Sequence, residues 1–198
     1  MLEEQQIYLI TLVEKDNMLE KFDLSSFKKM KPPGDNTFDT MQEIKTINKI
    51  PIRKDFVKEY DDIEKAFEKT AKREGVKDYD KRIAKAVIKE SAPVILKLKK
   101  HFNRPRPKVL AKKMNIKMKD IELPSMKTPS YPSGHSTQGK TIAMLLSDKY
   151  PQAKDAFMQT GDNISYSRNV AHAHYPSDSK LGKELGEEMY NFIKNNGS

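Results

Sequence analysis

Three of the four histidines lie in short segments that also carry serine, glycine, arginine or aspartate. The first segment, residues 131–137, reads YPSGHST and leads from a predicted loop into a predicted helix. The free N–H groups at a helix N-terminus attract anions, so the Ser133 hydroxyl and the amides of Gly134 and His135 could hold an anion together. An ordinary helix cap with an exposed His135 explains this segment, taken alone, about as well.

The second segment holds Ser167, Arg168, His174 and Asp178. Asp178 follows His174 by four residues, so its carboxylate could accept a hydrogen bond from one imidazole nitrogen and leave the other lone pair free to attack. Pro176 disfavours a regular helix between them, and the pairing could instead cross a turn. A surface histidine near a capping aspartate is the alternative, and the segment by itself favours it. His172, beside this group, fits no role, and we expect it at the surface.

The third segment, residues 99–107, reads KKHFNRPRP. A basic run is most often a solvated face or a patch that steers anions. Lys99, however, closes an apolar helix, from which its ammonium group could reach a cleft at the helix end. Arg106 lies in an extended segment stiffened by prolines, which suits a fixed guanidinium that binds phosphate.

The elements that must position these segments read as helices. Apolar residues at helical spacing predict helices over 37–48, 54–74, 79–102, 136–150, from about 152 onward, and over a last segment containing Leu181, Leu185, Met189 and Ile193. Residues 117–132 have no period and contain three prolines, so we expect a loop. No strand alternation competes, and we predict an all-α, single-domain helical bundle with its chemistry at the helix ends.

The N-terminal segment bears on the domain boundary, on membrane association and on the compartment. Residues 1–30 read as a short apolar segment followed by a polar helix, and we treat 1–35 as an N-terminal segment of uncertain role and 36–198 as the helical domain. The longest apolar run, Ile7 to Val13, is far short of the roughly 20 residues that span a bilayer, so we expect no integral membrane segment. It is also a poor secretory signal, so the chain as it stands suggests the cytoplasm, with a periplasmic or secreted protein, its signal removed, as the alternative.

Composition narrows the classes of chemistry. The chain has 198 residues, enough for one domain, and no cysteine, which excludes disulfides, thiolate nucleophiles and cysteine-ligated metals. Its net charge of +9 should attract anions such as phosphorylated small molecules, nucleic acid or acidic lipid.

Together the three segments resemble the signature of the type 2 phosphatidic acid phosphatase superfamily, which includes bacterial class A acid phosphatases and vanadium haloperoxidases. The pattern K-x6-R-P, P-S-G-H and S-R-x5-H-x3-D is matched in order and without a mismatch, from Lys99 to Asp178. Lys97 with Arg104 also satisfies the first part. We prefer Lys99 with Arg106, because the similar acid phosphatases carry an aromatic residue and a further arginine inside the spacer, as Phe102 and Arg104 do here.

The resemblance implies a helical bundle of the acid phosphatase/vanadium haloperoxidase type and a role for each matched residue. The implied phosphate-binding residues are Lys99, Arg106, Ser133, Gly134 and Arg168. His174 would attack phosphorus to form a phosphohistidine, Asp178 would fix its tautomer, and His135 would protonate the leaving group and then activate water. No metal or other cofactor is implied, since three fixed cations would neutralise the phosphoryl charge, and vanadate is expected as an inhibitor.

The leading hypothesis is therefore metal-independent hydrolysis of a soluble phosphomonoester or diphosphate, with a phosphorylated small molecule as the partner. A vanadate-dependent haloperoxidase is the first alternative, with vanadate as its cofactor. A basic nucleic-acid-binding protein is the second, supported by the net charge and by the lysines between Lys112 and Lys119. We do not expect a nucleic-acid partner, because the basic residues are dispersed among acidic ones and no nucleic-acid motif appears.

Overall fold

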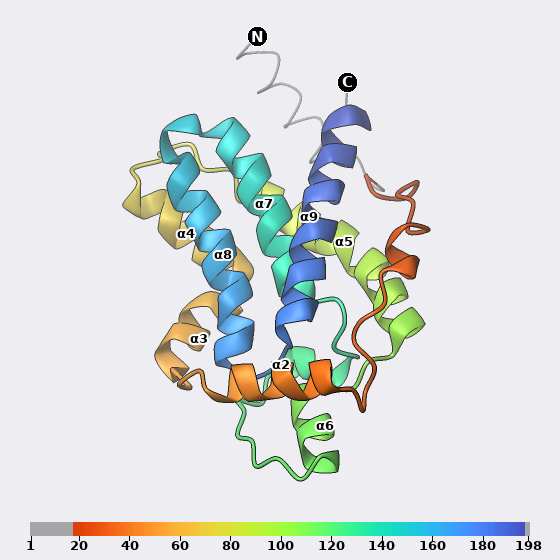
Figure 1. Ribbon diagram of the computed structural model, residues 1–198. Helices are drawn as coiled ribbons and strands as arrows, with labels where there is room; N and C mark the ends of the chain where they lie inside the picture. Colours follow the sequence, from red (N-terminus) through yellow and green to blue (C-terminus); the bar gives the residue numbers. More distant parts are fainter. Residues whose placement is uncertain (1–17, 197–198) are drawn as a thin grey trace.

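The computed structural model describes residues 18–196, and all the regular elements in this range are helices (Figure 1). The α-helices are α2 (Phe38–Asn48), α3 (Lys54–Asp61), α4 (Ile63–Arg73), α5 (Lys81–Phe102), α6 (Pro107–Lys113), α7 (Gly134–Lys149), α8 (Lys154–Val170) and α9 (Pro176–Asn196). Short 3-10 helices are η1 (Phe27–Lys29), η2 (Pro124–Lys127) and η3 (Pro151–Ala153). The predicted all-α class is confirmed, and none of the helices within 18–196 is long and apolar enough to cross a membrane.

Local sequence sets the helix ends. Thr37, Asp62, Asp80 and Ser133 each accept a hydrogen bond from a backbone N–H in the first turn of the helix that follows. Helix α5 ends at Phe102 because Asn103 takes the left-handed conformation, with φ of 47°.

The predicted helix over 54–74 is wrong as a single element. The chain breaks at Asp62, where ψ is 100°, into α3 and α4. The apolar spacing of Phe56, Tyr60, Ile63 and Phe67 runs across the break without a change of period, so periodicity alone gives no sign of it. The break lies next to Asp61, whose position matters below.

Two other helix predictions need correction. Helix α6 was not predicted, because the prolines around Arg106 indicated an extended segment, whereas Pro107 is the first residue of this helix, where proline fits. A polar helix was predicted within residues 1–30, but the described part, 18–30, contains only the 3-10 turn η1. The apolar run at 7–13 lies outside the described residues.

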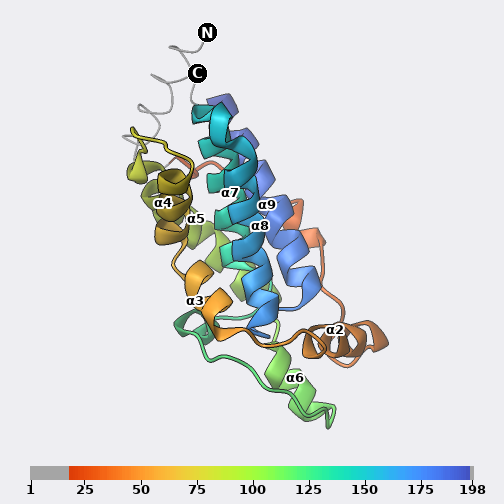
Figure 2. The same ribbon diagram turned by 90° about the vertical axis from the view of Figure 1, so that its left-hand side faces the viewer.

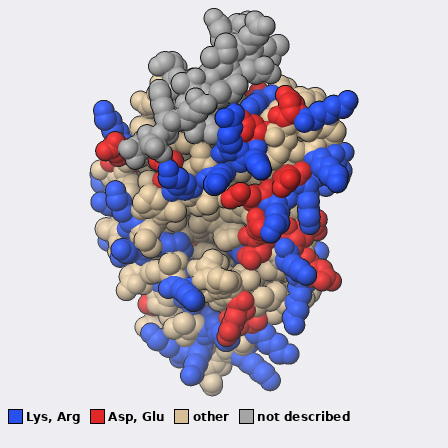
Figure 3. Space-filling view, turned by 180° about the vertical axis from the view of Figure 1, so that it is seen from behind, with Lys and Arg blue, Asp and Glu red and all other residues tan. Residues whose placement is uncertain are grey.

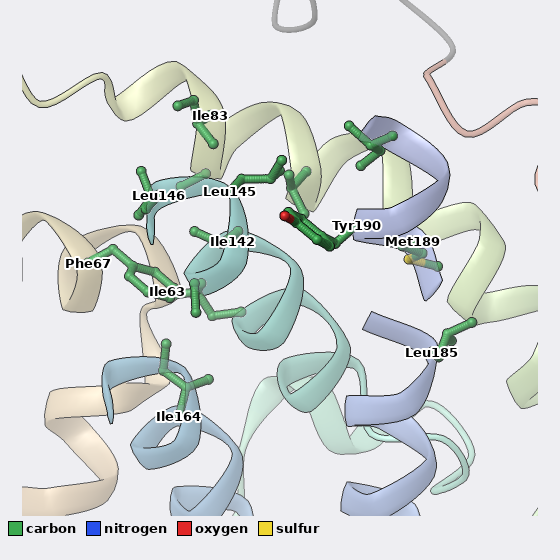
Figure 4. Packing of buried hydrophobic residues seen from close by; sticks show 14 of the residues in the cluster. Ile63, Phe67, Ile83, Ile142, Leu145, Leu146, Ile164, Leu185, Met189 and Tyr190 are labelled. Atoms are coloured by element: carbon green, nitrogen blue, oxygen red, sulfur yellow. The ribbon is translucent and has the colours of Figure 1, made fainter. Parts of the chain in front are cut away.

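The core forms around α7, which lies between α8 and α9, with α4 and α5 packed against the group (Figures 1 and 4). Figure 4 shows apolar side chains from all five helices directed toward one another. The labelled residues are Ile63 and Phe67 of α4, Ile83 of α5, Ile142, Leu145 and Leu146 of α7, Ile164 of α8, and Leu185, Met189 and Tyr190 of α9. Burial of this apolar surface is the main stabilising contribution to the bundle.

Glycines let α9 approach α7 closely. A Cβ atom on Gly182 would lie 2.6 Å from the carbonyl oxygen of Ser133, and one on Gly186 would lie 2.5 Å from that of Thr137. No larger residue fits at either position without a shift of the helices. The close approach holds the N-terminal ends of α7 and α9 side by side, and the Ser133 N–H donates to the Asp178 carbonyl oxygen over 3.0 Å.

Helix α2 crosses the end of the bundle where α7 and α9 begin and α8 ends, and α6 projects beyond it (Figures 1 and 2). Glu43 of α2 accepts a hydrogen bond from the Ser177 N–H over 2.7 Å and so caps α9. The three segments singled out from the sequence meet at this end. Elsewhere, Figure 3 shows basic side chains with acidic ones among them on the face opposite to that of Figure 1.

Candidate active site

His174 and Asp178 form a buried hydrogen-bonded pair at the start of α9. The imidazole Nδ1 lies 3.0 Å from Asp178 Oδ2, and the Arg106 Nη1 lies 2.9 Å from the imidazole Nε2. A guanidinium only donates, so Nε2 must be the accepting nitrogen and Nδ1 carries the proton. Pro176 does not interrupt the pair, because it is the first residue of α9 and His174 lies just before the helix. The arrangement is that of an oriented nucleophile, with its lone pair on Nε2.

The Asp178 carboxylate is saturated by donors. Its Oδ2 also accepts from the Ser130 hydroxyl and from the Tyr175 N–H, and its Oδ1 lies 2.7 Å from Arg104 Nη1. Burial acts to raise the pKa of Asp178, but the hydrogen bonds from His174 and Ser130 and the charge of Arg104 outweigh it, and the pKa is lowered. The carboxylate is therefore an anion that holds the Nδ1 proton in place.

His174 is held neutral. Burial lowers the pKa of His174 well below its usual value, helped by the charges of Arg106 and Lys99 and opposed by Asp178. A neutral imidazole keeps the lone pair that an attack on an electrophile requires.

Lys99 and Arg106 bring two cations to this pair. Lys99, in the last turn of α5, is 6 % exposed and donates to the carbonyl oxygen of Pro129, whereas Lys97 is exposed. Arg106, which precedes α6, donates to the carbonyl oxygens of Thr128, Ser125 and Ala173, each over 2.9 Å. Burial, with Arg106 nearby, lowers the pKa of Lys99 to about 7. Of the two spacings that match K-x6-R-P, the structure thus brings Lys99 and Arg106 to His174.

Arg168 supplies a third cation from the last turn of α8. Its side chain is fully buried, with Nε 3.0 Å from the Ser167 hydroxyl and Nη1 2.7 Å from Asp61 Oδ1. The charge of Arg168 acts on Arg106 and on His135, which places all three groups around one region.

The N-terminus of α7 contributes Ser133, Gly134 and His135. The buried Ser133 hydroxyl accepts from the Ser136 N–H at 3.3 Å, and Gly134 is the first residue of the helix. The His135 side chain is 18 % exposed and donates from Nε2 to the Asp61 carbonyl oxygen over 3.0 Å. Burial and the charge of Arg168 lower the pKa of His135 to about 4, against the opposing effect of Asp61. The charge of Lys99 acts on both His135 and His174.

Sequence reasoning missed several residues around this site. Arg104 is buried between Asp178 and Glu43, with its guanidinium 3.7 Å above the Tyr175 ring, and so supports the carboxylate from behind. Its place in the spacer was noted, but not its partners, which come from segments far away in the sequence. Asp61 had no signal, because it lies in the segment interpreted as one unbroken helix.

The prediction that His172 lies at the surface is wrong. Its side chain is buried, its φ is 56°, and its ring nitrogens lie 2.7 Å from the Lys119 carbonyl oxygen and 2.9 Å from that of Ile50. The ring ties the chain before α3 and the loop after α6 to the end of α8. It is a structural residue next to the site.

Within residues 18–196, no group of three or more His, Cys, Asp or Glu side chains is arranged to hold a metal ion. The ionisable groups described above for the site are four cations, two histidines and three carboxylates.

Comparisons with known proteins identify the family of the chain. The family described as the PAP2 superfamily matches residues 85–188, just over half of the chain. A non-specific acid phosphatase of Salmonella typhimurium is 34% identical over 88 residues, which are 44% of this chain and 35% of that protein. An acid phosphatase of Zymomonas mobilis is 33% identical over 100 residues, 50% of this chain and 38% of its own length. The matches span little more than a third of these relatives. The chain belongs to the PAP2 superfamily.

Proposed function

We propose that this protein is an acid phosphatase that hydrolyses a phosphomonoester or diphosphate through a phosphohistidine on His174. The observation that carries the proposal is the tautomer of His174. Its Nε2 lone pair, fixed by the Asp178 carboxylate behind the ring, faces Arg106 and Lys99. A nucleophile surrounded by cations suits an anionic electrophile, and the acid phosphatases similar to this chain support phosphate as that anion.

The phosphoryl oxygens are bound by the donors that converge near His174. Lys99, Arg106 and Arg168 neutralise the charge, and the Ser133 hydroxyl and the Gly134 N–H, at the positive end of α7, donate hydrogen bonds. These donors are fixed before the substrate arrives, so they stabilise the transition state without reorganisation.

The reaction proceeds in two displacements. His174 Nε2 donates its lone pair to phosphorus, the bond from phosphorus to the leaving oxygen breaks, and His135 protonates that oxygen. Asp178 stabilises the positive charge that develops on the His174 ring. His135 then takes a proton from water, the water oxygen attacks phosphorus, and the electron pair of the phosphorus–nitrogen bond returns to His174.

The electrostatics favour acidic conditions. Lys99, with a pKa of about 7, is fully charged only at lower pH, and His135 must be protonated to serve as the acid. His174, with its pKa well below the usual value, stays neutral as the pH falls. The nucleophile thus remains available at the acidic pH at which the phosphate-binding cation Lys99 is fully charged.

The test is phosphate release from an alkyl or aryl phosphate in excess chelator. His174→Ala should abolish turnover. The wild-type protein, trapped during turnover, should carry an acid-labile phosphorus–nitrogen bond that His174→Ala does not form. His101→Ala is the matched control, because His101 is exposed on α5 and its ring contacts the Lys28 carbonyl oxygen, away from the site. Vanadate should inhibit the wild type. Full activity of His174→Ala refutes the proposal, and bromide oxidation with peroxide and vanadate, without ester hydrolysis, assigns the haloperoxidase function instead.

A further inference from the structure

The hydrogen bonds of Arg168 account for only part of its guanidinium. Nε binds the Ser167 hydroxyl and Nη1 binds Asp61, but the buried Nη2 has no partner among the residues that the structure describes. A buried unpartnered donor is costly in a folded protein and commonly marks the place of a ligand. With Nε and Nη1 both held, the guanidinium plane is fixed, and the charge of Arg168 acts on Arg106 nearby.

Asp61 makes two contacts at this site with two different groups. Its carboxylate holds Arg168 Nη1 at 2.7 Å, and its main-chain carbonyl oxygen accepts from His135 Nε2 at 3.0 Å. The same carboxylate oxygen lies 3.8 Å from the His135 ring, too far for a hydrogen bond but near enough to act by charge. One residue therefore connects the cation of α8 with the histidine of α7.

The break between α3 and α4 places Asp61 where it can do this. Asp62 leaves the helical conformation and caps α4, so α3 ends with Asp61. The main-chain carbonyl of Asp61 is thereby free of a continuing helix and is directed at His135.

Resting on the proposed phosphatase function, we infer that Asp61 is a positioning residue, which directs Arg168 Nη2 to the phosphoryl group and orients the His135 imidazole toward the leaving group. Asp61 touches neither phosphorus nor the leaving oxygen in this role. It fixes two groups that do.

The charge of Asp61 adds a second effect, on proton transfer. The charged groups around His135 are Arg168 of α8 and Lys99 of α5, which both lower its pKa, and Asp61 of α3, which raises it. Loss of the Asp61 charge therefore lowers the pKa of His135 further. Since the general acid must be protonated, the activity then declines at a lower pH on the alkaline side.

The experiment compares Asp61→Ala and Asp61→Asn with Asp62→Asn as the matched control. Asp62 is the adjacent carboxylate and is comparably exposed. Within residues 18–196 its carboxylate bonds to Lys65 in the first turn of α4. Asparagine at position 61 keeps an oxygen that accepts from Arg168 but loses the charge, whereas alanine loses both. The first measurement is kcat and KM as a function of pH on an alkyl phosphate, because protonation of its poor leaving group limits the rate. The second is the Kd of inorganic phosphate, measured by calorimetry.

We expect Asp61→Ala to lower kcat/KM about 100-fold and to weaken phosphate binding about tenfold. Asp61→Asn should keep phosphate affinity and most of kcat near its own optimum. In both variants the alkaline limb of the kcat profile should shift to lower pH. Asp62→Asn should change neither the phosphate affinity nor the alkaline limb. A purely structural role would leave that limb in place.

Each other outcome has one meaning. If Asp61→Ala matches Asp62→Asn, or if Asp61→Asn is as damaging as Asp61→Ala, the positioning role is overturned. If Asp61→Ala does not fold, Asp61→Asn decides through its pH limb, and an unmoved limb overturns the inference. If the wild type binds phosphate but hydrolyses no ester, the proposed function fails. The phosphate affinities of Asp61→Ala and the wild type then still test the positioning role of Asp61. If the wild type does not bind phosphate, the proposed function and the role of Asp61 are both overturned.

Discussion

Gly182 offers the sharpest test of how helix packing positions the N-terminal end of α7, where we propose that phosphate binds. In Gly182→Ala the new Cβ would lie 2.6 Å from the Ser133 carbonyl oxygen, and 3.4 Å is an ordinary contact, so α9 and α7 must separate locally by about 0.8 Å. Ser133 caps α7 and also donates its N–H to the Asp178 carbonyl oxygen. The separation therefore acts on both helix ends that form the site.

Two opposing effects set the change in stability. Overpacking a fitted contact costs about 1–3 kcal/mol. Replacement of a helical glycine by alanine returns up to about 1 kcal/mol through helix propensity. We expect a net loss of about 1–2 kcal/mol in the free energy of unfolding. We also expect a fall of about 10- to 100-fold in kcat, because a displacement near 1 Å at the reacting groups is costly.

Gly186→Ala is the matched control. Its Cβ would lie 2.5 Å from the Thr137 carbonyl oxygen, so the steric conflict is nearly the same, but Gly186 lies one turn further from the start of α9. Urea unfolding should give similar losses for the two variants, while steady-state kinetics should show a much larger loss of kcat for Gly182→Ala. Equal kinetic losses, or no loss of stability in either variant, would refute the reasoning.

Other residues give further predictions. Between pH 7 and 9 the unfolded chain keeps the Lys99 proton that the folded chain loses. The free energy of unfolding of the wild type should therefore rise by about 2 kcal/mol over this range, compared with that of Lys99→Met. Urea unfolding at each pH measures this difference. Arg104→Met leaves Asp178 and Glu43 without their cation and should cost about 3–5 kcal/mol in the same assay, and a loss below 1 kcal/mol would contradict the buried pairing. Asp178→Asn should lower kcat about 10³- to 10⁴-fold, because an amide N–H next to Nδ1 favours the opposite tautomer of His174. A kcat within tenfold of the wild-type value would show that Asp178 does not set this tautomer.

The extent to which the sequence predicts the site follows from the range of the interactions. His174 and Asp178 pair within one turn, and Ser133 caps its own helix, so both arrangements are visible in local spacing. The partners of Arg104 are 61 and 74 residues away, and those of Arg168 include a residue 107 positions earlier, so no local pattern could indicate them.

The helices show the same division. Five predicted segments each correspond to one helix, and the sixth, 54–74, covers both α3 and α4, because their apolar faces repeat at helical spacing. The break at Asp62 and the start of α6 at Pro107 depend on single capping residues, which leave the apolar period unchanged. His172 was misplaced for a related reason, since its burial arises from two carbonyl oxygens in distant loops.

The contact between Arg106 and His174 has a consequence for selectivity. The guanidinium donates to the one lone pair of the imidazole, and three main-chain carbonyl oxygens hold it there. Under the proposed function, an uncharged electrophile such as an alkylating reagent meets a shielded nitrogen. The cation that shields this nitrogen is the same group that attracts the oxygens of a phosphate ester, so the site discriminates by charge before any bond forms.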